Sequence, residues 1–406
     1  MKILVGVIYT LLPEIVLLIS AVALAHYAIY FPNAGVLATE LVSLFILLVC
    51  LALSMQFNRS RMFFALLTLL MGYGALLVII GASDNLTRQI LGGGLCLFMP
   101  LDLVWMHGLR ERGIFTRYGI WPFGMILLEI IFIIVLVGIR PQGVADALFV
   151  KFIQWPMFAN TNISQPGMLL LFIGLLWIND RLLRQHSAEI AAFFFAILAT
   201  AVMLGSRQPV TVAIFAAASA LAFGLAIVLE SWSMAYLDEL TGLPGRRALE
   251  EQMRQLGSRY VIAMLDVDHF KNFNDTYGHD MGDQVLRLVA SRLQQCGGGG
   301  KAFRYGGEEF GLLYPGKVLK ETVLVLEALR CDIESSGFNP RKGERRAAPG
   351  IQDTGDDGNP LRVTVSIGAA ENSISRGDPW SVLKNADQAL YDAKHNGRNQ
   401  VCARGL

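Results

Sequence analysis

The stretch Arg304-Tyr305-Gly306-Gly307-Glu308-Glu309-Phe310 places two glycines and two carboxylates between two short apolar segments. Residues 302–305 and 310–314 have the composition of strands, and the paired glycines predict a hairpin with a two-residue turn at positive φ. Adjacent carboxylates at a tight, water-accessible tip suit a divalent metal ion, because hard cations prefer carboxylate oxygens. Taken alone, the pattern also fits a solvated acidic hairpin, since short motifs match by chance.

Charge divides the chain into two unequal parts. Residues 1–230 carry 12 Lys and Arg and 10 Asp and Glu, whereas residues 231–406 carry 22 and 23, the rest of the totals of 34 and 33. The first part is therefore a hydrophobic body, and the second has the composition of an ordinary soluble domain. A net charge of +1 argues against a broad basic face and against nucleic acid as a partner. Five cysteines without paired spacing indicate free thiols in a reducing compartment.

Apolar stretches predict an all-α polytopic membrane bundle of about eight helices over residues 1–230. The sixth stretch is short unless its polar ends reach the membrane interface. Arginines gather in the loops after even-numbered stretches, so we expect these loops and both termini to face the cytoplasm. The stretches lie at about residues 4–30, 35–56, 62–82, 89–108, 119–139, 166–179, 189–206 and 209–230.

A few acidic residues fall inside these stretches. Glu14 and Glu129 lie closest to mid-span, whereas Glu40, Asp102 and Asp180 lie nearer the ends. A charge at membrane depth is costly and usually faces the bundle interior. Such a residue either binds a ligand or ion, or makes an internal hydrogen bond that fixes helix packing. We favour the internal hydrogen bond for each residue taken singly.

The last apolar stretch leads into the soluble part without a glycine, proline or polar tract. We therefore assign residues 231–241 to a coupling helix that continues out of the membrane, and the glycines and proline of 242–245 end it. Residues 242–406 form the soluble domain. Within it, the polar segment 337–360 is expected to be a mobile insertion.

An apolar run from Tyr260 to Asp266 ends on a carboxylate, as a buried strand does when its carboxyl edge carries chemistry. Glycine-rich loops beside acidic residues and a lysine suit a bound nucleotide, because backbone N–H groups cradle phosphates and carboxylates hold Mg²⁺. Apolar periodicity predicts helices from about residue 283, over about 317–335 and over about 380–396, and a strand over 361–369.

From Asp238 to the C-terminus the chain resembles the GGDEF-domain diguanylate cyclases. The resemblance implies an α/β domain of the nucleotide-cyclase and polymerase-palm type, with an antiparallel-centred sheet flanked by helices. The matching blocks are Asp238-x-Leu240-Thr241-Gly242-Leu243-x-x-Arg246-Arg247, Asp266-Val267-Asp268-x-Phe270-Lys271-x-x-Asn274-Asp275-x-x-Gly278-His279-x-x-Gly282-Asp283, Arg304 to Phe310, Ser366-Ile367-Gly368, and Ala386-Asp387-x-Ala389-Leu390-Tyr391-x-Ala393-Lys394-x-x-Gly397-Arg398-Asn399.

The resemblance also implies the roles of individual residues. Asp266 and Glu308 are expected to ligate Mg²⁺, or alternatively Mn²⁺, together with the backbone carbonyl of Val267. Glu309 assists the metals or the attacking hydroxyl, and Glu308, Glu309 and Lys271 are the residues expected to carry catalysis.

Substrate binding is implied for a second group of residues. Asn274 and Asp283 are expected to read the guanine edge of GTP. Lys394 and Arg398 are four residues apart near the end of the last helix, so they can reach the same side; charge compensation of that helix end is the alternative. The phosphate-binding positions are Phe270 through its backbone N–H, Lys271, Lys394 and Arg398.

The function implied is that of a membrane-bound diguanylate cyclase in the bacterial inner membrane, with its catalytic domain in the cytoplasm. Two GTP molecules meet head to tail in a homodimer and condense to cyclic di-GMP with release of two pyrophosphates. The membrane region is expected to contact lipid, to bind a ligand that no motif identifies and to regulate synthesis. The alternative is a catalytically silent GTP-binding receptor or scaffold of the same fold. Silent members usually lack a metal-binding or signature residue, and those residues are all present here.

One departure from the family pattern concerns regulation. The product-inhibition site of the family is an Arg-x-x-Asp motif five residues upstream of the first motif glycine. Here Gly297 and Gly300 occupy those positions. We therefore expect the primary inhibitory site to be missing.

Overall fold

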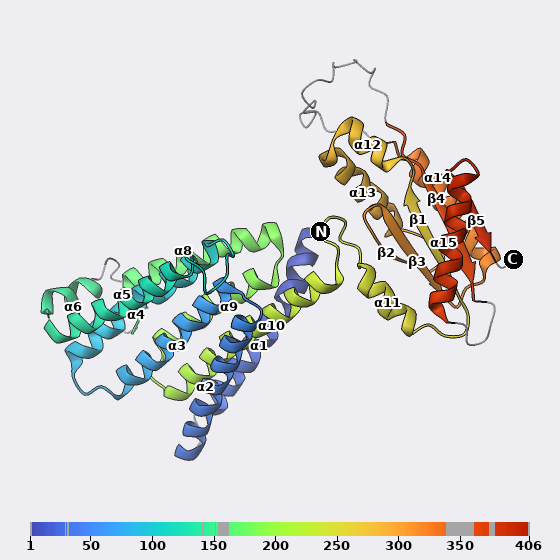
Figure 1. Cartoon of the computed structure of the whole chain (residues 1–406). Coiled ribbons are helices and arrows are strands. Elements are labelled where there is room, and N and C mark those ends of the chain that lie inside the picture. Colours follow the sequence, from blue (N-terminus) through green and yellow to red (C-terminus); the bar gives the residue numbers. More distant parts are fainter. Residues whose placement is uncertain are drawn as a thin grey trace. The chain divides into compact units, whose positions relative to one another are not determined.

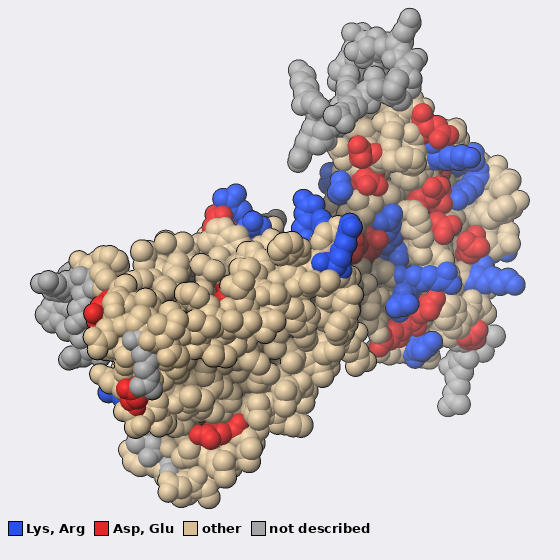
Figure 2. Space-filling model, turned by 60° about the vertical axis from the view of Figure 1, so that its left-hand side comes forward, with Lys and Arg blue, Asp and Glu red and all other residues tan. Residues whose placement is uncertain are grey.

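The computed structural model describes residues 2–28, 30, 32–139, 141–150, 152, 162–337, 361–372 and 378–404. The chain divides into two compact units, residues 1–231 and 232–406, whose elements are labelled in Figure 1. On the face drawn in Figure 2, the first unit shows few charged side chains and the second shows many of both signs. Apart from Gly337, the expected insertion at 337–360 lies outside the described residues.

Eight helices of the first unit are long and apolar enough to cross a membrane. The sixth is longer than its apolar stretch, because a Ser164 side chain caps its first turn and Asp180 pairs with Arg184 at 2.9 Å near its end. A short helix, α6 (Gln142–Leu148), was not expected. The eight are α1 (Lys2–Ala28), α2 (Asn33–Gln56), α3 (Ser60–Gly81), α4 (Asn85–Gly108), α5 (Ile120–Ile139), α8 (Gln165–Gln185), α9 (Ala188–Gly205) and α10 (Pro209–Tyr236).

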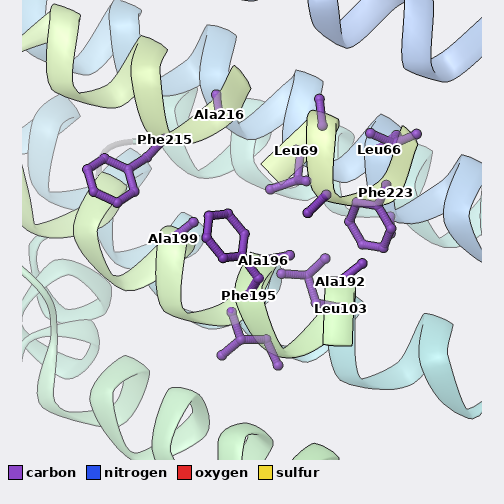
Figure 3. Close-up of a cluster of buried hydrophobic side chains, with 14 of the residues drawn as sticks. Leu66, Leu69, Leu103, Ala192, Phe195, Ala196, Ala199, Phe215, Ala216 and Phe223 are labelled. Carbon is purple, nitrogen blue, oxygen red and sulfur yellow. The ribbon is translucent and has the colours of Figure 1, made fainter. Parts of the chain in front are cut away.

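Helices α9 and α10 form the centre of this unit and are mostly buried, whereas α1, α2 and α5 expose most of their apolar surface. Small alanine side chains let neighbouring helix backbones approach closely, and phenylalanine rings fill the spaces between them. Figure 3 shows this packing among Leu66, Leu69, Leu103, Ala192, Phe195, Ala196, Ala199, Phe215, Ala216 and Phe223.

Three of the five acidic residues named above within the apolar stretches point into the unit, whereas Glu40 is half-buried and Asp180 is exposed. Glu14, Asp102 and Glu129 are all buried. Thr68 Oγ1 donates a hydrogen bond to Asp102 Oδ2 at 3.2 Å, which links α3 to α4. The expected internal hydrogen bond is therefore confirmed for Asp102.

At one end of the first unit, ion pairs join the connections that follow the even-numbered spans. Arg61, which opens α3, pairs with Glu111 at 3.3 Å and with Glu189 at 2.6 Å. Arg59 pairs with Glu230 of α10 at 3.4 Å. These residues come from the segments after α2, α4 and α8 and from the last turns of α10. The even-numbered connections therefore share one end of the bundle, as the positive-inside pattern predicts.

Helix α10 continues without a break to Tyr236, and the chain then turns. The helix ends earlier than the expected end of the coupling helix at residue 241. Its end is fixed by a turn in which Gly242 N donates to Asp238 O at 2.8 Å, with Gly242 at a φ of 69°. This left-handed conformation explains the glycine.

A five-stranded sheet in the order β2-β3-β1-β4-β5 forms the second unit. All neighbouring strands are antiparallel except β4 and β5, which agrees with the expected antiparallel centre. The strands are β1 (Tyr260–Val267), β2 (Lys301–Arg304), β3 (Glu309–Pro315), β4 (Val365–Glu371) and β5 (Val401–Arg404). Strand β4 begins later than the expected residue 361, because its first residue pairs with the last residue of β1.

Helices cover both faces of this sheet, and alternation along β1 decides which side chain meets which helix. Val261, Ala263 and Leu265 point into a core with α13 (His279–Leu293) and α14 (Leu319–Ser335). Ile262 and Met264 point into a second core with α11 (Arg246–Arg254) and α15 (Pro379–His395). Figure 1 shows α15 against β4. Helices α11 and α12 (Phe270–Tyr277) and strand β5 were not predicted.

Candidate active site

Asp266 is the penultimate residue of β1 and lies on the face covered by α15. It is 5% exposed, and Lys394 Nζ of α15 lies 2.8 Å from its Oδ2. Burial raises the pKa of the Asp266 carboxyl, and the Lys394 ammonium opposes that rise. Asp266 pairs in register with Glu309 of β3, so the two carboxylates share this face of the sheet.

The Gly-Gly-Glu-Glu hairpin forms, but its turn differs from the expected two-residue turn. The last ladder pair joins Arg304 to Phe310, and neither Gly306 nor Gly307 has a left-handed backbone. The longer loop does not need positive φ, because the Arg304 side chain holds it together. Its Nε donates to Gly306 O at 3.2 Å and its Nη2 to Gly307 O at 2.7 Å.

Gly306 is needed for space. A Cβ at this position would lie 2.9 Å from Glu309 Oε2. A larger residue would therefore displace the Glu309 carboxylate from the edge that it shares with Asp266. This close approach explains one of the two motif glycines.

Three carboxylates and one ammonium meet at this edge. Burial raises the pKa of Glu308 and of Glu309, and the negative charge of Asp266 raises both further. The Lys394 ammonium lowers both. The mutual repulsion of these carboxylates favours a bound cation, as in other clustered acidic sites.

The donor set fits a hard divalent cation. Asp266 and Glu308 offer carboxylate oxygens. Val267 N donates a hydrogen bond to Glu308 O at 3.4 Å, which holds the hairpin against the end of β1. Mg²⁺ is usually held by one or two protein carboxylates with substrate phosphates. Among the described residues no group of three or more His, Cys, Asp or Glu side chains forms a metal site by itself. Two carboxylates, a backbone carbonyl and a phosphate ligand meet the requirement for Mg²⁺ without a third side chain.

The amino end of α12 lies directly after β1. His269 adopts a left-handed φ of 57° and turns the chain sharply into the helix. The first backbone bond into this helix runs from Phe273 N to His269 O at 3.0 Å, so the amides of Phe270 and Lys271 belong to the open end. Such an end attracts anions. Lys271 is exposed beside it.

Asn274 and Asp283 lie where α12 meets α13. Asn274 Oδ1 is buried without a hydrogen-bond partner among the described residues. A Cβ on Gly282 would overlap this oxygen, so the glycine lets the two helices approach, and Asp283 follows it half-buried. An orphaned buried acceptor is costly and is satisfied when a ligand donates an N–H.

Helix α15 brings Lys394 to the site because it lies directly on the sheet. A Cβ on Gly368 of β4 would overlap the backbone nitrogen of Leu390. Arg398 follows the helix, is exposed, and its charge lowers the pKa of Asp266 against the dominant effect of burial. Lys394 thus contacts Asp266 directly, and a shared side for Lys394 and Arg398 stays a prediction.

Five residues of the motif blocks have contacts that the sequence alone does not reveal. Arg304 Nη1 pairs with Asp238 Oδ1 at 2.7 Å, which ties the turn after α10 to the hairpin. Asp268 accepts hydrogen bonds from Ser366 Oγ at 2.6 Å and from Asn399 N at 3.0 Å. The Asp268 carboxylate is thus hydrogen-bonded to residues of its own domain, although Asp268 lies only two residues from Asp266.

The segment upstream of the hairpin has no room for the family's inhibitory aspartate. A Cβ on Gly300 would lie 2.6 Å from the buried ring of Tyr314 and 3.0 Å from Cys296 Sγ. At Gly297 the nearest atom, of Val325, is 3.8 Å away. Packing therefore excludes a side chain at residue 300, whereas residue 297 has space for one.

Residues 235–400 match the family model described as "Diguanylate cyclase, GGDEF domain". This part of the chain is a GGDEF domain. Over 171 residues the chain is 40% identical to diguanylate cyclase VdcA of Vibrio cholerae, covering 41% of this chain and 46% of that protein. Over 189 residues it is 34% identical to the response regulator PleD of Caulobacter vibrioides, covering 43% and 37%. The chain thus spans less than half the length of these curated relatives.

Among solved structures, a coiled-coil and GGDEF-domain fragment of DgcB from Caulobacter crescentus in complex with c-di-GMP is similar to this chain. The two are 32% identical, and the match covers 44% of this chain and 90% of that fragment, with a TM-score of 0.38. The assignment of the GGDEF domain rests on the sequence match. The family-model match falls within the second unit.

Proposed function

We propose that the protein is a diguanylate cyclase that condenses two GTP molecules into cyclic di-GMP. The observation that carries the proposal is the edge at the end of β1, where Asp266, Glu308 and Glu309 meet the Lys394 ammonium. The curated relatives named as diguanylate cyclases support the same activity. Each 3′-hydroxyl attacks the α-phosphate of the other GTP, a new P–O bond forms, and pyrophosphate leaves as the α–β bond breaks.

The residues of this chain hold the substrate and neutralise its charge. The amides at the start of α12 and the side chains of Lys271, Lys394 and Arg398 bind the triphosphate. Asn274 and Asp283 read the guanine edge, with the unpartnered Asn274 Oδ1 as an acceptor. Glu309 receives the proton of the attacking hydroxyl or orients that group.

Asp266, Glu308 and the carbonyl of Val267 would hold the Mg²⁺ or Mn²⁺ that such cyclases generally use. The bound cation supplies charge neutralisation of the phosphates. Lys394 lies 2.8 Å from the Asp266 carboxylate, so its ammonium group is placed at the edge where the phosphates would bind.

Catalysis requires two copies of the domain. One site binds one GTP, and the attacking hydroxyl belongs to the second GTP, so two sites must face each other at reacting distance. We therefore propose a homodimer as the active state. The full chain supplies a means to form it, because its hydrophobic unit confines two copies to one surface.

The first unit is proposed to cross the bacterial inner membrane eight times, with both termini in the cytoplasm. Its exposed apolar helices α1, α2 and α5 would contact lipid. The shared end of the even-numbered connections, held by Arg59, Arg61 and Glu230, supports this topology. An unidentified ligand of this unit is proposed to control synthesis.

The competing function is a GTP-binding receptor without catalysis. Replacement of Glu308 by glutamine separates the two, because it keeps the size of the side chain and removes its charge. We expect Glu308→Gln to abolish cyclic di-GMP synthesis by at least about a hundredfold while GTP binding and the melting temperature stay near wild-type values. Turnover that survives in Glu308→Gln would contradict the role assigned to Glu308, and a wild type that binds GTP without turnover would favour the receptor.

A further inference from the structure

The turn between α15 and β5 contains two consecutive non-glycine residues with left-handed backbone. The φ angle is 63° at Arg398 and 46° at Asn399, directly after Gly397 at 109°. Residues with a Cβ rarely adopt this conformation, because the side chain crowds the backbone. Strain of this kind persists only where the surrounding structure imposes it.

Asn399 is the residue on which that surrounding structure acts. Its backbone N–H donates to Asp268 Oδ2 at 3.0 Å, and its side-chain N–H donates to Glu334 Oε1 at 2.9 Å. Its Oδ1 accepts from Arg330 Nη1 at 2.6 Å. These three hydrogen bonds of Asn399 are thus all made with charged groups, and such bonds are stronger than bonds between neutral groups.

The partners of Asn399 are themselves fixed. Asp268 also accepts from Thr364 Oγ1 at 2.9 Å and from Ser366 Oγ at 2.6 Å. Arg330 is only 9% exposed and pairs with Glu334 at 2.7 Å within α14. The segment after β1, the start of β4 and helix α14 therefore converge on a single residue of the turn.

Arg398, the residue beside Asn399, is free to bind a ligand. Its side chain is exposed, and among the described residues no ion pair or hydrogen bond occupies its guanidinium. The N–H of the next residue, Asn399, donates to Asp268 Oδ2 at 3.0 Å, so the turn lies at the end of β1, two residues beyond Asp266. The turn thus places an unpaired cation beside the carboxylate edge.

We propose that Asn399 is a positioning residue, which holds the left-handed turn and thereby keeps the Arg398 guanidinium beside Asp266 to bind the phosphates of the nucleotide. The inference rests on the proposed function in one respect, that the site binds a guanine nucleotide. The competing explanation is that Asn399 only fastens α14 to the sheet. That explanation predicts lower stability and no selective effect on phosphate binding.

The test compares nucleotides that differ in their phosphates, with full-length protein in lipid nanodiscs. Binding is measured for GMP and for the α,β-methylene analogue of GTP, whose bridging carbon prevents turnover. We expect Asn399→Ala to weaken binding of the triphosphate analogue about tenfold, the scale of one charge-assisted contact, and to leave GMP binding unchanged. Asn399→Gly is the second variant, because it accepts left-handed backbone and folds if Asn399→Ala does not.

Two further measurements identify the route of the effect. In an Arg398→Ala background, Asn399→Ala should cause no additional loss of triphosphate binding, because the two residues act through one guanidinium. The matched control is Asn372→Ala, which loses a 2.8 Å bond from its side chain to Ser258 O at the other end of β4. It should lower the melting temperature without changing the ratio of the two affinities.

Equal losses for GMP and the triphosphate analogue, an undiminished triphosphate affinity, or an additive loss in the double variant would each overturn the positioning role. Failure of the proposed function looks different. A wild type that binds the analogue with the Asn399 dependence described above and yet makes no cyclic di-GMP supports the inference and contradicts the cyclase activity.

Discussion

Gly300 occupies the position at which related domains carry the aspartate of their product-inhibition site. A Cβ there would lie 2.6 Å from Tyr314, whose ring is buried. Sequence shows that the aspartate is missing, and the structure adds that the space for it is filled. A buried ring in a packed core does not move aside at low cost.

We therefore expect cyclic di-GMP not to inhibit through residues 297–300. Gly300→Ala should lower the free energy of unfolding by about 1–3 kcal/mol through overpacking. The control Gly297→Ala should be close to neutral, since its nearest neighbour lies 3.8 Å away. Thermal melts of both variants and steady-state rates with added product check these expectations. Potent non-competitive inhibition that maps to these residues would contradict them.

At the residue scale, the motif positions predicted which side chains lie close together. They did not predict the backbone conformation that holds these side chains in place. Asp266 and Lys394 were predicted to share a site with Arg398, and the structure brings Asp266 and Lys394 to 2.8 Å from each other. The positive φ expected at Gly306 was wrong, because the side chain of Arg304, which also pairs with Asp238, closes the loop. The partners Arg304 and Asp238 are 66 residues apart. Contacts of this range arise from the tertiary fold and leave no local pattern.

At the scale of elements, helix α15 depends on a close approach to β4. A Cβ on Gly368 would overlap backbone atoms of Leu390 and Ala386, and backbone atoms have no alternative rotamer. The glycine of the Ser-Ile-Gly block therefore sets the distance at which α15 carries Lys394 over Asp266.

We expect Gly368→Ala to displace α15, to lower stability by about 1–3 kcal/mol and to reduce GTP turnover at least about tenfold by misplacing Lys394. Gly257→Ala is the control, because its Cβ would have no neighbour within 4 Å. Melting temperatures and initial rates are compared. Normal turnover in a destabilised Gly368→Ala would show that the position of α15 does not limit the reaction.

The hairpin and the turn after α10 are joined by a single guanidinium. Arg304 binds Asp238 Oδ1 and the carbonyls of Gly306 and Gly307. A lysine lacks the planar fork needed to reach three such acceptors. The hairpin that carries Glu308 is thus fixed by the same residue that anchors the end of the coupling helix.

Arg304→Lys should therefore lower GTP turnover at least about tenfold while the domain stays folded. Arg292→Lys is the matched control, since the pair that Arg292 forms with Asp332 is partly exposed and long, at 3.7 Å, and such a pair contributes little. The readouts are initial rates and circular dichroism melts. Equal activity of Arg304→Lys and Arg292→Lys would rule out the hairpin support.

Apolar periodicity found the long elements and missed the short ones. The buried side chains of α13, α14 and α15 recur with the period of a helix. The side chains of β1 alternate between two cores, one on each face of the sheet. Helix α12 has only eight residues and a largely polar sequence, so its helical state depends on packing against α13. Strand β5 has four residues, and its pairing with β4 was not visible before the fold was known.

At the scale of the whole molecule, helix α10 runs without a break through Trp232 to Tyr236. A continuous helix transmits rotation or shift, whereas a flexible segment absorbs it. We propose that the membrane unit uses this helix to set how two GGDEF domains face each other. The alternative is that α10 is only an anchor.

Insertions of equal length between Ser233 and Met234 separate these possibilities. Seven alanines add about two helical turns and nearly preserve the helical phase, so synthesis should persist. Seven glycines weaken the helix by about 1 kcal/mol per residue, so synthesis or its response should change severalfold while GTP binding per domain stays constant. Equal activity of the alanine and glycine insertions would show that the helix is a tether.

The most direct test of the account is the stoichiometry of GTP turnover by the purified full-length protein with Mg²⁺. The account predicts that two GTP are consumed and two pyrophosphates released for each cyclic di-GMP formed, and that chelation of the cation stops the reaction. Folded protein that binds GTP and yet yields no cyclic di-GMP, or that releases phosphate or linear products instead, would contradict it.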